Sequence, residues 1–232
     1  PMLTVEVQLT EHLRHHRKVS KEAARNSALE LLATVKIPEP AAALRAHPSQ
    51  FSGGMRQRIA IAMALACEPK LLIADEPTTA LDVTIQAQIM TLLKDLQKTA
   101  GKSFILITHN MALVSEVADH VAVMYLGRVV EYGAVNEVLR DPRHPYTQAL
   151  MASVPTLDAN KDVELQTVDG QTPSPAEVTI GCEFAGRCPY VIAACKEKTI
   201  EMTQISTSHE VRCIRLDANG KLPVLVGGAK NE

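Results

Sequence analysis

The sequence predicts an α/β fold: a parallel sheet with a helical N-terminal subdomain, followed by a small C-terminal extension that contains cysteines. Two short apolar runs, at residues 70–74 and 103–108, alternate with helical patterns, as expected for buried parallel strands. Residues 1–50 show helical periodicity instead. Four of the five cysteines follow residue 180, which sets the last part of the chain apart.

Composition limits the class of protein. The chain has 232 residues, of which 46% are hydrophobic and 22% charged, values typical of a globular protein. Its 24 basic and 26 acidic residues give a net charge of −2, which argues against a large basic surface for nucleic acid. We find no apolar run of about 18 residues and no apolar signal segment, so we expect a cytoplasmic protein.

The first 50 residues are expected to form helices. An amphipathic helix spans Leu3–Leu13, and Ser20 has the character of an N-cap for a second helix, which Pro38 and Pro40 end. The segment His12–Lys18 is rich in His, Arg and Lys, and its simplest interpretation is a solvated helix face.

The middle of the chain carries the α/β pattern. Gly53 and Gly54 open a helix that runs to about Ala66, and Cys67 at its end is expected to be a core residue. Asp82 is predicted to cap the helix between the two apolar strands, and Gly101 to end it. Further elements are a helix from about 111, strands at 121–126 and 128–131, and a helix from 145 to 153.

An acidic pair follows the first apolar strand. Ligands of open parallel sheets bind beyond the carboxyl ends of the strands, where Asp75 and Glu76 are expected. Asp75 is suited to hold the water shell of Mg²⁺, and Glu76 to polarise a water that attacks a phosphoryl group. The alternative is two acidic residues in a surface loop.

Two further features favour a phosphate site. Ser52, Gly53, Gly54 and Met55 lie at the start of a helix, where bare backbone N–H groups and the helix dipole attract anions. His109 ends the strand beside the acidic one and is placed to contact a γ-phosphate.

These motifs resemble those of the ATP-binding subunits of ABC transporters. Ser52–Gly53–Gly54 is similar to the signature motif, with Met55 where many members have Gln. Residues 71–75 resemble Walker B, Glu76 the catalytic glutamate, Asp82 the end of the D-loop and His109 the switch histidine. The resemblance implies a subunit that binds ATP and Mg²⁺, pairs with a second ATPase subunit and energises transmembrane permease subunits from the cytoplasmic face of the membrane.

The resemblance also implies a domain order. Residues 1–67 correspond to the helical subdomain, 68–140 to the second half of the catalytic domain, and 141–232 to a C-terminal extension. The stretch Arg143–Leu150 and the later cysteines resemble the branch that imports dipeptides, oligopeptides or nickel, with an extracytoplasmic binding protein as an indirect partner. In such a fold the basic face at 12–18 has docking on membrane subunits as its second interpretation.

A phosphate-binding loop, G-x-x-x-x-G-K-[ST], is absent from the sequence. Gly101–Lys102–Ser103 has the right ending, but Leu96 stands where the first glycine is required. We therefore expect a chain that begins halfway through the catalytic domain, with exposed strand edges, apolar surface and poor stability in isolation. Such a chain would not hydrolyse ATP alone, so a non-catalytic module that completes a partner's site or docks on membrane subunits is the rival hypothesis.

The cysteines suggest a ligand set. Cys182, Cys188, Cys195 and Cys213 are spaced C-x5-C-x6-C-x17-C, and in a reducing cytoplasm this clustering indicates a metal. Four thiolates suit a [4Fe–4S] cluster or Zn²⁺. The absence of close C-x2-C pairs, and the resemblance, favour the cluster; four unliganded thiols are the remaining alternative. A third hypothesis for the whole chain is therefore a redox or structural metal module.

Overall fold

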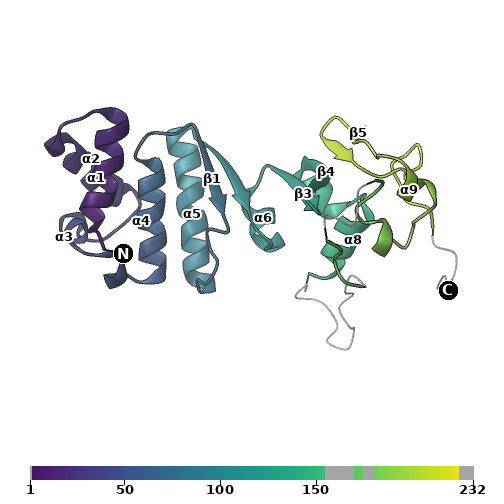
Figure 1. The fold of residues 1–232 in the computed structure, drawn as a ribbon, viewed down its shortest axis with the longest axis horizontal. Coiled ribbons are helices and arrows are strands. Elements are labelled where there is room, and N and C mark those ends of the chain that lie inside the picture. The colour runs from purple at the N-terminus through teal and green to yellow at the C-terminus, as the bar shows by residue number, and fades with distance from the viewer. Residues whose placement is uncertain (1, 155–169, 175–179, 225–232) are drawn as a thin grey trace. The chain divides into compact units, whose positions relative to one another are not determined.

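The computed structural model describes residues 2–154, 170–174 and 180–224 and divides the chain into two compact units, residues 1–109 and 110–232 (Figure 1). The boundary falls inside the segment 68–140 that the sequence assigns to one domain, and the predicted domain limits remain a prediction. None of the described helices has the length and hydropathy that a membrane span requires.

The first unit begins with helices that pack around aliphatic side chains. Thr4 and Ser20 cap the first two helices by accepting hydrogen bonds from backbone N–H groups, as the sequence predicts for Ser20. Leu9, Leu13 and Leu32 are fully buried between them. The elements are α1 (Val5–Arg17), α2 (Lys21–Thr34), α3 (Pro40–Arg45), the 3₁₀ turn η1 (Pro48–Gln50) and α4 (Gly53–Leu65).

Two expectations for this region need correction. Pro40 does not only follow the end of α2; it occupies the first turn of α3, where its missing N–H group is tolerated. Cys67 is exposed and is not a core residue, because α4 ends at Leu65 and the chain turns outward after the buried Ala66.

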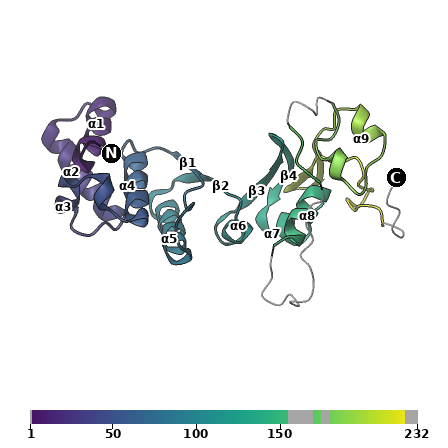
Figure 2. The ribbon, with the colours of Figure 1, turned by 60° about the horizontal axis from the view of Figure 1, so that its bottom comes forward.

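A two-stranded parallel sheet follows, formed by β1 (Leu71–Asp75) and β2 (Ser103–Ile107) and connected by α5 (Val83–Ala100). Helix α5 lies beside α4 in both views (Figures 1 and 2). Asp82 caps α5 and Gly101 ends it in the left-handed conformation, both as predicted.

The two strands are not buried, in contrast to the prediction. Leu72 is buried, but alternate residues project from the other face, and their exposed fractions are 47% for Leu71, 61% for Ile73, 47% for Ile105 and 48% for Ile107. Ile73 is the register partner of Ile105, so these side chains form one continuous apolar face. The strands are as apolar as buried parallel strands, yet the described residues of the first unit cover only one of their faces, which agrees with the expected apolar surface.

The second unit is built on a four-stranded antiparallel sheet of order β3-β4-β6-β5. The strands at 121–131 therefore do not extend the parallel sheet. Leu126 and Gly127 both have positive φ angles, of 46° and 79°, which is the backbone of a tight hairpin turn. The elements are α6 (Met111–Val117), β3 (His120–Tyr125), β4 (Arg128–Ala134), α7 (Val135–Arg140), α8 (Pro145–Ala152), η2 (Ala185–Arg187), α9 (Ala194–Glu197), β5 (Thr203–Ser206) and β6 (His209–Val211).

Candidate nucleotide site and cysteine cluster

The acidic pair and the histidine meet at the carboxyl ends of the parallel strands. Register pairing of Asp75 with Ile107 aligns the two strand ends, and the Glu76 N–H group continues the ladder by donating to the Ile107 carbonyl at 2.9 Å. His109 then donates from Nδ1 to the Glu76 carboxylate at 3.1 Å. The exposed Asp75 is one residue away, so carboxylates and an imidazole share one solvent-facing edge.

A hydroxyl group that sequence reasoning missed also holds Glu76. Thr79 donates to the second carboxylate oxygen at 2.8 Å. This hydrogen bond is the main reason that the pKa of Glu76 lies below its usual value, and the hydrogen bond from His109 lowers it further. Glu76 is therefore held as an ionised carboxylate with a fixed orientation.

The loop after Glu76 has an unusual backbone. Glu76 and Ala80 have positive φ angles of 43° and 62°, a conformation that side chains disfavour and that often marks functional loops. Gln86 of α5 supports the loop by donating from Nε2 to the carbonyls of Thr78 (3.3 Å) and Leu81 (3.0 Å). Residues 77–82 contain no glycine, so the sequence alone does not predict the positive φ angles of this loop.

The predicted anion site at the start of α4 lies against the end of the same loop. Ser52 caps α4 by accepting a hydrogen bond from the Met55 N–H group at 3.3 Å. A Cβ atom on Gly53 would lie 3.1 Å from Leu81, and one on Gly54 only 2.5 Å from Cγ2 of Ile85. The glycines thus let α4 approach α5 closely, a packing role that the sequence interpretation as bare phosphate-binding backbone did not include.

The four C-terminal cysteines line one cavity in the second unit. Cys182, Cys188, Cys195 and Cys213 all contribute to its wall. A backbone hydrogen bond of 2.7 Å from Cys182 to Cys195 joins two of the segments. Gly181 permits this approach: its φ is +92°, and a Cβ atom there would lie 2.5 Å from the Cys195 carbonyl oxygen. The glycine before Cys182 was the signal in the sequence for this contact.

Cys182, Cys188 and Cys213 are half-buried, and burial changes the acidity of their thiols. The pKa of Cys182 is raised to about 11 and that of Cys188 to about 12, mainly by burial and to a smaller extent by the neighbouring thiols. Burial also raises the pKa of Cys213. Such thiols stay protonated unless a cation replaces the protons.

In the described part of the chain, no three His, Cys, Asp or Glu side chains lie close enough together to hold a single metal ion. The cavity wall nevertheless carries four thiols and Arg215, whose Nε is buried without a hydrogen-bond partner among the described residues. The cavity has a volume of only about 10 Å³, so the described side chains as they stand fit neither a single metal ion nor a cluster.

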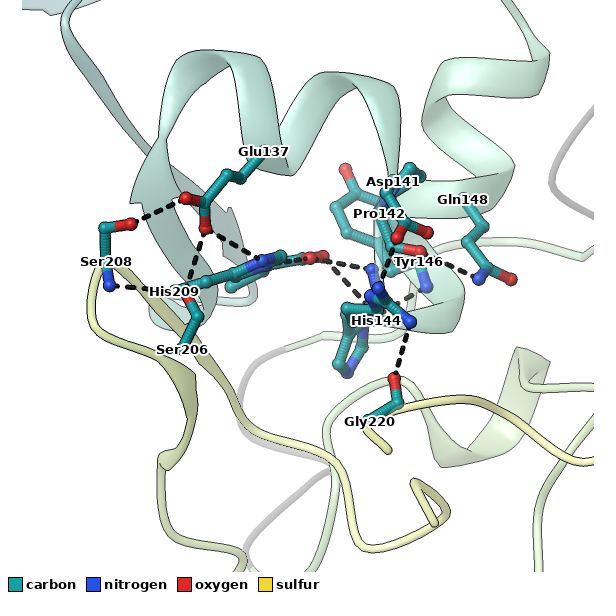
Figure 3. Close-up of polar contacts among 12 residues, drawn as sticks. Glu137, Asp141, Pro142, His144, Tyr146, Gln148, Ser206, Ser208, His209 and Gly220 are labelled. Carbon is teal, nitrogen blue, oxygen red and sulfur yellow. Dashed lines mark hydrogen bonds and ion pairs between the residues drawn. The ribbon is translucent and has the colours of Figure 1, made fainter. Parts of the chain in front are cut away.

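His144, which lines this cavity, belongs to a polar network that reaches the antiparallel sheet. Figure 3 shows the polar contacts around it. The Glu131 carboxylate of β4 accepts hydrogen bonds from the backbone N–H groups of Arg143 (2.7 Å) and His144 (3.0 Å). The imidazole Nδ1 of His144 in turn accepts from the Tyr146 N–H group at 3.1 Å and caps α8. His144 is 1% exposed and lines the cysteine cavity, and burial lowers its pKa to about 4.

Two family models match the chain. Residues 2–79 match the model described as ABC transporter, and residues 130–195 match the model described as oligopeptide/dipeptide transporter, C-terminal region. The first match covers the capped α4 and the acidic pair, and the second covers most of β4, all of α7 and α8, and three of the four cysteines.

Known proteins with similar sequences give the same result. The chain is 51% identical over 231 residues to the dipeptide transport ATP-binding protein DppD of Bacillus subtilis, covering all of this chain and 69% of DppD. It is 52% identical over 212 residues to the oligopeptide transport ATP-binding protein OppD of the same organism, covering 91% of this chain and 59% of OppD.

Solved structures support the fold. A dimeric bacterial ABC transporter cassette, MJ0796, is 33% identical and superposes with a TM-score of 0.52, covering 58% of each chain. A metal-chelate type ABC transporter in an inward-facing conformation superposes with a TM-score of 0.55 at 23% identity, covering 64% of this chain and 57% of that one.

The fold, the strand-end acidic pair and these matches define an ATP-binding subunit of an ABC transporter. Within that class, the chain belongs to the dipeptide and oligopeptide transporter family.

Proposed function

We propose that this chain supplies catalytic and dimer-contact residues of a MgATP-hydrolysing subunit that powers peptide uptake. The observation that carries the proposal is the hydrogen bond between Glu76 and His109 at the carboxyl ends of two parallel strands. A carboxylate oriented there is suited to a water that attacks a phosphoryl group. The names of the relatives favour dipeptides or oligopeptides as cargo over nickel.

Each residue then has a role that follows from its position. Glu76 orients or deprotonates the attacking water, and His109 contacts the γ-phosphate. Asp75 holds the water shell of Mg²⁺. The N-terminus of α4, formed by Ser52, Gly53, Gly54 and Met55, faces the nucleotide of a second ATPase subunit. Asp82 lies at the end of the loop that follows Glu76 and contributes to nucleotide binding.

The assembly follows from the missing phosphate-binding loop. Because the sequence has no G-x-x-x-x-G-K-[ST] motif, this chain offers no such cradle for the phosphates at its own Glu76. The proposed active form therefore includes that loop from a further segment, a second ATPase subunit, and permease subunits at the cytoplasmic face of the membrane.

Replacing Glu76 by Gln tests the catalytic proposal. In a subunit that also carries the phosphate-binding loop, we expect Glu76→Gln to bind MgATP while turnover collapses, because the amide no longer accepts the water's proton. Lys94→Gln on the middle of α5, away from this loop, is the control and should retain turnover. Unchanged turnover in Glu76→Gln would reject the role.

A second candidate is a non-catalytic module that completes a partner's nucleotide site or docks on membrane subunits. The absent phosphate-binding motif favours it for this chain taken alone. The two candidates differ in one measurement: the isolated chain should show no ATPase activity if it is such a module, and measurable activity would reject that hypothesis.

We further propose that the four cysteines hold a [4Fe–4S] cluster. The proposal is supported by the cavity that the four cysteines share and by their spacing, which lacks the close C-x2-C pairs typical of zinc sites. When bound, the cluster supplies one-electron redox chemistry or structural cross-linking. Anaerobically purified protein should be brown, with iron that is lost when Cys182 and Cys195 are replaced by Ser; zinc without iron would reject the cluster.

A further inference from the structure

The loop between Glu76 and α5 is held at two points by a side chain of the helix that follows it. Gln86 lies near the start of α5, and its Nε2 atom donates to the carbonyl oxygens of Thr78 (3.3 Å) and Leu81 (3.0 Å). Carbonyl oxygens only accept hydrogen bonds, so the amide nitrogen and not the amide oxygen must face them. Each of the two N–H bonds of the amide therefore has its own acceptor in the loop.

The two carbonyls flank the strained part of the loop. Ala80 lies between them and has a φ angle of 62°, a left-handed conformation that a residue with a Cβ atom adopts only where its surroundings enforce it. Within the turn, the Leu81 N–H group donates to the Thr78 carbonyl at 3.2 Å. This single hydrogen bond leaves the turn free to relax, and the two hydrogen bonds from Gln86 oppose that relaxation.

The loop in turn determines where the Glu76 carboxylate points. Thr79 follows the first of the two held carbonyls, and its hydroxyl group donates to Oε2 of Glu76 at 2.8 Å. The N–H group of Thr79 also donates to the Glu76 carbonyl at 3.1 Å. A shift of the loop backbone therefore moves the hydroxyl group that orients the carboxylate, and Gln86 acts on Glu76 through Thr79.

The start of α5 does not depend on the Gln86 side chain. Asp82 caps the helix by accepting a hydrogen bond from the Ile85 N–H group at 2.9 Å. The backbone N–H group of Gln86 donates to the Asp82 carbonyl at 2.9 Å, as in any first helical turn. Replacing the side chain of Gln86 should thus leave the helix in place and change the loop.

We propose that Gln86 is a positioning residue for ATP hydrolysis, which holds the loop 77–81 so that Thr79 keeps the Glu76 carboxylate directed at the attacking water. The inference rests on the proposed catalytic function of Glu76. Because the contacts of the Gln86 amide are with the loop backbone, its loss should slow the chemical step and leave the binding of MgATP unchanged.

The test is steady-state ATP hydrolysis by the subunit that also carries the phosphate-binding loop, assembled with its partner subunit. Gln86→Glu keeps the shape of the side chain but directs a carboxylate at two carbonyl oxygens, and we expect kcat to fall about tenfold with KM for MgATP unchanged. Gln86→Met removes the donors without this repulsion, so its kcat should fall less. Ala80→Gly relieves the unfavourable φ angle, and adding it to Gln86→Met should recover part of the lost kcat.

Gln88→Met is the matched control, because Gln88 is an exposed glutamine of the same helix whose Oε1 accepts from Arg58 at 3.2 Å, away from the loop. Its kcat should remain that of the unmodified subunit. Hydrogen exchange supplies a readout that does not depend on activity. The Thr79 and Leu81 amides should exchange faster in Gln86→Met, while exchange in the middle of α5 stays unchanged.

Glu76→Gln, measured in the same series, separates this inference from the proposed function. Unchanged turnover in Glu76→Gln overturns both. Collapsed turnover in Glu76→Gln together with an unaltered kcat in Gln86→Glu and Gln86→Met overturns this inference alone. An equal fall of kcat in Gln88→Met, a change confined to KM, or faster exchange along the whole of α5 would also overturn it, since Gln86 would then act through the helix and not through the loop.

Discussion

Glu131 accepts a hydrogen bond of 2.7 Å from Nε2 of His209, although the two residues are 78 positions apart and almost completely buried. The pair joins β4 to β6, and the same carboxylate accepts the N–H groups that lead into α8. One buried side chain thereby links the sheet, the turn into α8 and the wall of the cysteine cavity.

Removing His209 should destabilise the second unit strongly. His209→Ala leaves the Glu131 carboxylate buried with one partner fewer, and breaking a buried pair in this way costs about 3–5 kcal/mol. Chemical unfolding followed by circular dichroism measures the loss. Ser206→Ala removes an exposed hydroxyl group nearby and serves as the control. An equal loss of unfolding free energy in both variants would contradict a large contribution from the buried pair.

Thr79 should influence turnover through Glu76. Thr79→Val keeps the shape of the side chain but removes the hydroxyl that donates to the carboxylate. We expect kcat of the ATP-hydrolysing subunit to fall about tenfold, because small misplacement of a catalytic group has large effects, with KM for MgATP unchanged. Thr79→Ser restores the donor and should restore kcat. Failure of this rescue would mean that Thr79 acts only through packing.

Gly54 should tolerate no side chain. A Cβ atom there would lie 2.5 Å from Cγ2 of Ile85, so Gly54→Ala forces α4 and α5 apart and should destabilise the first unit by about 1–3 kcal/mol. Gly53→Ala, which meets only the end of the Leu81 side chain at 3.1 Å, should cost less. Thermal unfolding compares the two, and adding Ile85→Ala to Gly54→Ala should recover part of the loss.

Acid should weaken the contact between α7 and the β5–β6 turn. Hydrogen bonds from Ser208 and Ser206 lower the pKa of Glu137 below its usual value of 4.5. The ionised carboxylate therefore stabilises the folded state fully above pH 4.5, and this contribution is lost as the pH falls through the lowered folded pKa. Glu137→Gln should flatten the acid limb of a plot of unfolding midpoint against pH, and the double variant Ser206→Ala/Ser208→Ala should do the same; an unchanged limb in both would contradict the assignment.

Local chemistry made much of the fold predictable. Ser20 and Asp82 cap helices as expected. An N-cap requires only a polar side chain that accepts a hydrogen bond from the backbone N–H group three residues later. Glu76 and His109 follow two neighbouring parallel strands, so the sequence already indicated that their side chains would meet. The common cavity of the four cysteines agrees with their clustering after residue 180.

The features that sequence reasoning missed depend on contacts between distant segments. Nothing near Glu131 indicates His209 as its partner, and nothing near Gly54 indicates Ile85. The burial of β1 and β2 was wrongly predicted because composition reports how apolar a strand is and does not report whether a second layer covers it. Cys67 was misplaced for a related reason: it continues an apolar helix pattern beyond the residue where α4 stops.

The long separation of Glu131 and His209 also sets an order of events on the ribosome. At about 5–20 residues per second, the 78 positions between them take roughly 4 to 16 seconds to translate. Throughout that interval β4 has emerged without its partner strand β6, and its carboxylate has no imidazole to pair with. Cys213, the last of the four C-terminal cysteines, follows His209 by only a few residues, so the nascent chain completes this set of cysteines at nearly the same moment as the sheet that supports it.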